Sequence, residues 1–125
     1  MEAANARKAV GQRGEDLAVA ELERQGLQVL ARNWRCRTGE IDIIAVEHEG
    51  DRRTVVFCEV KCRTGLGFGD PLESITYAKR TKLRQLAAEW LAVSGVRPDG
   101  IRIDAIGVVM LPRALPALTH VRGIG

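Results

Sequence analysis

Asp42, Glu59 and Lys61 are the residues whose types and spacing point to chemistry in this chain. They lie in two apolar segments, residues 39–44 and 55–61, which are rich in β-branched side chains, as buried β-strands are. A charged carboxylate in an apolar setting is costly unless it is paired or its pKa shifts. These three groups are therefore expected to interact with one another, with a metal ion or with a substrate.

The two segments are expected to form an antiparallel hairpin, because a short polar stretch joins them. Glu59 and Lys61 share one face of their strand, since side chains alternate along it. If Glu47 pairs with Thr54, Asp42 lies directly opposite Glu59, with about 4.5–5.5 Å between the Cβ atoms. The two carboxylates could then hold one divalent cation, whereas a slip of one residue would place them on opposite faces.

A third carboxylate, Glu15, is expected on the buried face of an N-terminal helix over residues 3–25. It lies one or two turns before the apolar residues of that face, Ala18, Val19 and Leu22. Gly11, one turn earlier, is expected to allow close backbone approach. A carboxylate on such a face is unusual unless it meets a partner.

A helix glutamate, an aspartate and a Glu-x-Lys pair offer only oxygen ligands, which favour Mg²⁺ or Mn²⁺ over zinc or copper. A lysine beside the ion can hold a water molecule or help to deprotonate it. Together these groups suit metal-assisted hydrolysis of a phosphodiester. The alternative is a pair of structural salt bridges, in which Lys61 satisfies one carboxylate and the other acids stay unpaired.

Short motifs occur in order along the chain: Gly14-Glu15, Arg32-Asn33, Gly39-Glu40-Ile41-Asp42, Phe57-x-Glu59-Val60-Lys61-x-Arg63 and Phe68-Gly69. Over nearly the whole chain they resemble the YraN-like family of bacterial proteins. That family is placed in the PD-(D/E)xK nuclease superfamily, close to archaeal Holliday junction resolvases. The resemblance implies that Asp42, Glu59 and Lys61 match the core motif of the superfamily, although Asp42 follows isoleucine instead of proline. It also implies that Glu15 matches the helix glutamate of the resolvase-like branch.

Length and composition predict one domain over residues 1–125. No apolar run approaches about 18 residues and the start does not resemble a signal peptide, so a cytoplasmic protein without a membrane partner is expected. The three cysteines, Cys36, Cys58 and Cys62, have no recognised metal spacing and argue against a disulfide framework. Cys58 and Cys62 are expected to be packing residues.

Basic residues gather near the acidic strands, which favours nucleic acid as the partner more than the net charge of +3 does. Arg35, Arg37 and Arg63 flank those strands. Lys79 and Lys82 lie on a second helix, expected over residues 77–94, on a solvated face separate from Glu59 and Lys61. Phosphate contact is expected for the cluster, while any one of these residues alone is more simply a solvated side chain.

Other segments carry further expectations. Residues 64–71 contain spaced glycines but neither a P-loop nor a full Rossmann fingerprint, so they are either a mobile flap over the site or a plain connector. Trp34 is a candidate for stacking on a base. Asp104, in a last strand over residues 101–109, is expected to pair with an arginine. The end of the chain, residues 120–125, is expected to be frayed.

The expected fold is α/β and restriction-endonuclease-like. It has an N-terminal helix, a mixed β-sheet with a central hairpin, a second basic helix, and one or two closing strands. The expected function is that of a Mg²⁺- or Mn²⁺-dependent endonuclease acting on DNA that is branched or otherwise structured. A resolvase-like role would need a homodimer, so that two strands are cut symmetrically.

Each candidate site residue has an expected role. Asp42 and Glu59 would ligate the metal with help from the Val60 carbonyl, and Lys61 would position the attacking water. Glu15 would complete the outer shell of the ion or orient a second one. Two alternatives remain: a nucleic-acid-binding module that keeps the fold but does not cut, and a protein-interaction domain whose charges are structural.

Overall fold

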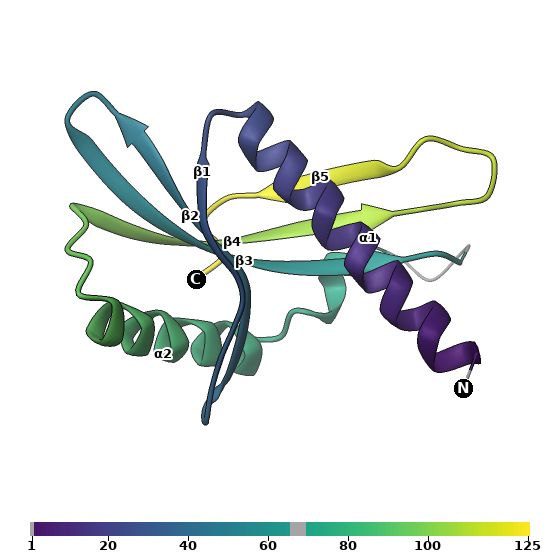
Figure 1. The fold of residues 1–125 in the computed structure, drawn as a ribbon, viewed down its shortest axis with the longest axis horizontal. Helices are drawn as coiled ribbons and strands as arrows, with labels where there is room; N and C mark the ends of the chain where they lie inside the picture. The colour runs from purple at the N-terminus through teal and green to yellow at the C-terminus, as the bar shows by residue number, and fades with distance from the viewer. Residues whose placement is uncertain (1, 66–69) are drawn as a thin grey trace.

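The computed structural model describes residues 2–65 and 70–125, with side chains from residue 8 onward. Along this part of the chain the elements are α1 (Glu2–Arg24), β1 (Gln28–Cys36), β2 (Gly39–Glu49), β3 (Arg52–Arg63), the 3₁₀ helix η1 (Pro71–Ser74), α2 (Tyr77–Ser94), β4 (Gly100–Val109) and β5 (Ala117–Val121). The strands form a mixed sheet in the order β1-β2-β3-β4-β5, in which β3 and β4 are parallel and the other neighbours antiparallel (Figure 1). The expected α/β class, with a hairpin flanked by helices, is confirmed.

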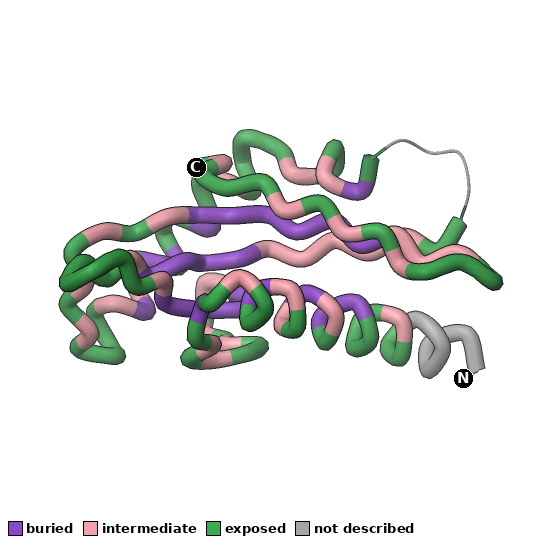
Figure 2. Tube along the Cα trace, turned by 90° about the horizontal axis from the view of Figure 1, so that it is seen from above, coloured by how far each residue is buried: buried purple, intermediate pink, exposed green. Residues whose placement is uncertain are grey.

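Each helix packs against its own face of the sheet. The cluster on the α1 side joins Ala18 and Leu22 to alternate strand residues such as Ile43 and Cys58. The cluster on the α2 side joins the buried stripe of that helix to the remaining alternate residues, including Phe57. In Figure 2 the buried segments accordingly run along the middle of the strands. The core is therefore two apolar layers with the sheet between them.

Glycine lets α1 approach the sheet closely, but at Gly14 and not at Gly11. A Cβ atom added at Gly14 would overlap the Cys62 sulfur and lie 3.3 Å from the Cys62 Cβ. A Cβ atom added at Gly11 would have nothing within 4 Å. The expectation for Gly11 was wrong, because that turn of α1 faces open space. Close packing at Gly14 places the next residue, Glu15, against the sheet.

Local signals define α2, and its expected bounds are confirmed. Thr76 caps the first turn by accepting the Lys79 N–H, and Gly95 ends the helix in the left-handed conformation at φ 73°. The ring of Trp90 packs edge-on against Phe57 at 5.7 Å between ring centroids. Trp34 also packs against this cluster and is only half-exposed, and its stacking on a base stays a prediction.

Glu47 pairs with Thr54, which is the register assumed for the hairpin, but the β2–β3 ladder ends at Ile43 and Cys58. Beyond that point β2 continues to pair with β1 as far as Gly39, while β3 continues along β4. β2 and β3 therefore separate one residue before the expected pairing of Asp42 with Glu59. The gap between them is where the candidate site lies.

Asp104 in β4 is fully buried and accepts hydrogen bonds from several donors. Arg102 donates from Nε at 2.8 Å and from a terminal nitrogen at 3.0 Å, which confirms the expected arginine partner. The backbone N–H of Gly123 donates to the same carboxylate at 3.0 Å, and the Ile124 N–H donates to the Ile103 carbonyl at 2.8 Å. The expectation of a frayed end was wrong, because these bonds hold the segment against β4.

Some expectations are not tested by the described residues. Residues 66–69, at the centre of the expected flap, lie outside them, so the flap stays a prediction. The single-domain assignment also stays a prediction. Neither α1 nor α2, as far as they are described, is long and apolar enough to cross a membrane.

Gly14→Ala is expected to lower the free energy of unfolding by about 1–2 kcal/mol, because the Cys62 side chain or the helix must shift to relieve the overlap. Gly11→Ala is the matched control in the same helix. There the added methyl group meets open space, and the change should stabilise by about 0.5–1 kcal/mol. Urea unfolding of both variants measures the difference. Equal effects at the two positions would contradict this account of α1 packing.

Candidate active site

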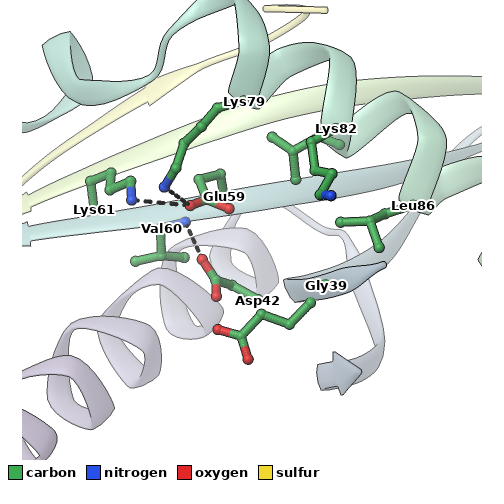
Figure 3. A pocket seen from close by; sticks show the side chains of 10 residues that line it. Gly39, Asp42, Glu59, Val60, Lys61, Lys79, Lys82 and Leu86 are labelled. Carbon is green, nitrogen blue, oxygen red and sulfur yellow. Dashed lines mark hydrogen bonds and ion pairs between the residues drawn. The ribbon is translucent and has the colours of Figure 1, made fainter. Parts of the chain in front are cut away.

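A hollow of about 350 Å³ opens where β2 leaves β3, under the first turns of α2. Leu83 and Leu86 of α2 form its apolar part. The other residues that line it are Gly39, Glu40, Asp42, Glu59, Val60, Lys61, Lys79 and Lys82. The structure thus brings Asp42, Glu59 and Lys61 into one hollow, together with two lysines from α2 (Figure 3).

Asp42 is half-buried at the fork, and its Oδ2 accepts the backbone N–H of Val60 at 2.8 Å. Burial, and then the negative charge of Glu59, raise the pKa of Asp42 to about 7 from its ordinary value of 3.8. The hydrogen bond from Val60 opposes this rise but does not cancel it. Asp42 is therefore a carboxyl group that changes charge near neutral pH.

Glu59 is held by two lysines at once. Its Oε1 lies 3.2 Å from the Nζ of Lys61 and 3.5 Å from the Nζ of Lys79, and only 13% of its side chain is exposed. Lys79 thus reaches the acidic site from α2, as Figure 3 shows. The expectation that Lys79 and Lys82 lie on a separate solvated face was wrong, because the crossover from β3 brings the start of α2 over this strand.

The two lysines that share Glu59 influence each other. Burial lowers the pKa of Lys61, but the Lys79 amine and then the Glu59 carboxylate outweigh it and raise that pKa above its ordinary value. The pKa of Lys79 is lowered, first by Lys61 and then by burial. Lys79 is therefore the member of the pair that more easily loses its charge.

A second hollow, on the α1 side, also reaches Asp42. It is lined by Lys8, Gly11, Gln12, Glu15, Asn33, Arg35, Glu40, Asp42, Val60 and Cys62. Ile41 and Ile44 both belong to the cluster on the α2 side while Ile43 belongs to the other, so side-chain alternation in β2 breaks at Asp42. In β1, Asn33 lies across from Asp42, between the residues that pair with Ile43 and Ile41, and has a positive φ of 51°. This local kink leaves Asp42 at the edge of both hollows.

Glu15 is buried as expected, but it already has protein partners. Its Oε1 accepts from Arg32 Nε at 2.8 Å and from Asn33 Nδ2 at 2.9 Å. It lines the second hollow and not the one that contains Glu59 and Lys61. These bonds tie α1 to the kinked part of β1, and the expected role beside the metal stays a prediction.

The expected phosphate-binding residues differ in position. Lys79 and Lys82 are exposed and line the first hollow. Arg35 pairs with Glu40 at 2.9 Å at the second hollow. Arg37 is exposed in the β1–β2 turn and borders neither hollow, and Arg63 is half-buried at the end of β3. Contact of these residues with nucleic acid stays a prediction.

The oxygen ligands of the first hollow suit a divalent ion such as Mg²⁺ that takes only a few of its ligands from the protein. Among the described residues, no group of three or more His, Cys, Asp or Glu side chains is arranged to hold a metal ion. Mg²⁺, however, commonly keeps several water ligands and uses one or two carboxylates. Asp42 and Glu59 provide two carboxylates in one hollow, so the residues present fit this ion.

Sequence reasoning missed two residues of the site. Glu40 lines both hollows, and its place two residues before Asp42 was the available signal. Asn33 makes the kink opposite Asp42, and asparagine is among the residues that tolerate positive φ. No local pattern indicates that Lys79 meets Glu59, since this depends on how α2 packs on the sheet.

Comparison with known proteins gives consistent matches along most of the chain. The sequence profile of the family described as "Uncharacterised protein family UPF0102" matches residues 14–108. A "UPF0102 protein" of Mycobacterium avium (strain 104) is 52% identical over 116 residues, which are 93% of this chain and 89% of the relative. A "UPF0102 protein" of Mycobacterium ulcerans (strain Agy99) is 49% identical over 119 residues, covering 95% of this chain and 96% of the relative. A "UPF0102 protein" of Streptomyces griseus is 47% identical over 121 residues, covering 96% of this chain and 98% of the relative.

Asp42→Asn is expected to remove a loss of stability that occurs as pH rises. The folded chain keeps the Asp42 proton up to about pH 7, whereas the unfolded chain releases it near its ordinary pKa of 3.8. The stabilisation by this proton is complete below the unfolded pKa and is lost as pH rises through the folded pKa. Above pH 7 the variant should exceed wild type by on the order of 2 kcal/mol, less than the full shift because water in the hollow screens charge.

Urea unfolding between pH 4 and pH 8.5 with a chelator present measures this effect on the free energy of unfolding. Asp51→Asn, made on an exposed carboxylate in the β2–β3 turn, controls for the loss of a charge as such. Parallel curves for wild type and Asp42→Asn would contradict the proposed burial of a charge at the fork.

Proposed function

The chain belongs to the uncharacterised protein family UPF0102, and we propose that it is a Mg²⁺- or Mn²⁺-dependent endonuclease that hydrolyses phosphodiester bonds of DNA. The observation that carries this proposal is the meeting of Asp42, Glu59 and Lys61 in one hollow. Two acids for a divalent ion and several lysines for phosphate suit metal-assisted hydrolysis of a phosphodiester.

Structural salt bridges alone account for this arrangement less well. Glu59 has lysine partners, but within the described residues Asp42 makes no ion pair and accepts one backbone hydrogen bond. Its raised pKa means that its charge is unfavourable where it stands. An ionisable group with a shifted pKa, placed in a hollow next to a second acid, is typical of functional sites.

The acids would hold the ion and the lysines would handle water and substrate. In this proposal Asp42 and Glu59 bind Mg²⁺ or Mn²⁺ with help from the Val60 carbonyl. When bound, such an ion lowers the pKa of a coordinated water and stabilises negative charge on the phosphate. Lys61, next to Glu59 on β3, positions the attacking water.

The basic residues would bind and orient the DNA. Lys79 and Lys82 contact phosphate oxygens from the α2 side of the hollow. Arg35, Arg37 and Arg63 contact the flanking backbone. Glu15, through Arg32 and Asn33, positions the kinked part of β1 opposite Asp42.

The resemblance to archaeal resolvases suggests branched or otherwise structured DNA as the substrate. Cutting two strands symmetrically would need a homodimer. A cleavage assay on linear, flapped and four-way DNA with Mg²⁺ or Mn²⁺, and with chelator as control, tests the function. Binding without cleavage on any of these substrates would favour the non-cutting module, and neither binding nor cleavage would favour the interaction domain.

Mg²⁺ and Mn²⁺ are expected to raise the thermal midpoint of the wild type, because an ion that binds the folded state stabilises it by mass action. At ten times the dissociation constant the gain is about 1.4 kcal/mol. The shift should vanish in Asp42→Asn, which removes a charged ligand. An equal shift in both proteins, measured by differential scanning calorimetry, would place the ion elsewhere.

Lys61→Ala is expected to reduce cleavage by on the order of 10²–10⁴-fold while DNA affinity stays nearly unchanged. One lysine is a small part of a footprint that covers several phosphates. Single-turnover cleavage and fluorescence anisotropy measure the two effects separately. Arg24→Ala removes a positive charge at the far end of α1, outside both hollows, and should leave cleavage intact.

A further inference from the structure

Lys79 occupies a position where a cation is unfavourable unless an anion compensates it. It lies in the first turn of α2, and its backbone N–H is fixed by the Thr76 side chain at 3.2 Å. The positive end of the helix dipole disfavours a cation in this turn. The Glu59 carboxylate, at 3.5 Å from the Lys79 Nζ, supplies the compensating charge.

The oxygen that holds Lys79 belongs to one of the two carboxylates proposed to bind the metal ion. Lys61 and Lys79 approach the same Oε1 of Glu59. A divalent ion such as Mg²⁺ binds carboxylate oxygens at about 2.0–2.1 Å. An ion between Asp42 and Glu59 would therefore lie close to the two ammonium groups on the Glu59 carboxylate. Repulsion between these positive charges favours the departure of one lysine.

Lys79 is the one that can leave. Lys61 is the closer of the two, its side chain is 25% exposed, and its strand is held by β4 at Gly107. The Lys79 side chain is 47% exposed and extends from a helix at the mouth of the hollow. A longer and more exposed ion pair is the weaker one. An exposed ammonium group released beside the hollow is free to bind a phosphate of the substrate.

We propose that Lys79 holds Glu59 while no metal ion is bound, leaves it when a divalent cation binds, and then contacts a phosphate of the substrate. This inference rests on the proposed function. It makes Lys79 the residue that couples the two binding events, because the cation frees the side chain that DNA uses. The ion and the DNA should each strengthen binding of the other through this side chain.

Lys82 is the matched control for Lys79. It lies one turn further along α2 and lines the same hollow. Within the described residues, however, the ion pairs to Glu59 come from Lys61 and Lys79. Lys79→Met and Lys82→Met each remove one charge from one helix and keep an unbranched side chain that suits a helix. Their difference isolates the contact with Glu59.

Titration calorimetry of Mn²⁺ without DNA tests the competition. Lys79→Met should bind Mn²⁺ about fivefold more tightly than wild type, and Lys82→Met less than about twofold more tightly. Equal Mn²⁺ affinities of the two variants would overturn the inference and leave the proposed nuclease standing. If neither wild type nor the variants bind Mn²⁺, the proposed function and the inference both fail. Binding by Lys79→Met alone would support the competition.

Anisotropy of a fluorescein-labelled four-way DNA junction tests the second half of the proposal. Ca²⁺ serves as a divalent ion with the same preference for oxygen ligands. In wild type and in Lys82→Met, Ca²⁺ should increase DNA affinity. In Lys79→Met this gain should be several-fold smaller, because only the direct contact of the ion with the phosphate is left. A gain as large in Lys79→Met as in Lys82→Met would overturn the coupling, even if Mn²⁺ affinity behaves as expected.

Discussion

The hydrogen bond from the Val60 N–H to the Asp42 carboxylate is the interaction on which the candidate site depends. β2 and β3 stop pairing at Ile43 and Cys58, and β2 then follows β1 while β3 follows β4. A backbone donor at such a fork needs a new acceptor. Asp42 provides this acceptor. The hydrogen bond that satisfies the Val60 N–H therefore also holds the Asp42 carboxylate in the gap between β2 and β3.

The two acids of the hollow have different environments, and this difference has chemical meaning. Glu59 is surrounded by ammonium groups, whereas Asp42 is bound by a neutral donor and titrates near neutral pH. A proton on Asp42 and a metal ion would compensate the same negative charge. Metal affinity should then depend on pH across the neutral range, because the ion has to displace that proton. Groups with such contrasting environments are the usual basis for separate roles at one site.

Features set by neighbours in sequence could be predicted, and features set by packing could not. The ends of α2 follow from Thr76 and Gly95, and the hairpin follows from the short polar stretch between its strands, whereas its register had to be assumed. The contact of Lys79 with Glu59 requires the crossover that carries the chain from β3 to β4, which no local pattern describes. The kink at Asn33 could not be predicted, because no strand was expected there and side-chain alternation was expected to continue through Asp42.

The parallel pairing of β3 with β4 also affects the order in which the site can form. Glu59 lies beside Ala105 and Lys61 beside Gly107, so the strand that carries both is completed by residues made much later in synthesis. The β2–β3 hairpin is local and can form early, but contacts between distant segments close slowly. Until β4 arrives, β3 is an exposed sheet edge, and its acidic and basic side chains have no fixed relation to α2. During synthesis, the chain therefore contains the acidic and basic residues of the motif before the sheet and α2 bring them together as a site.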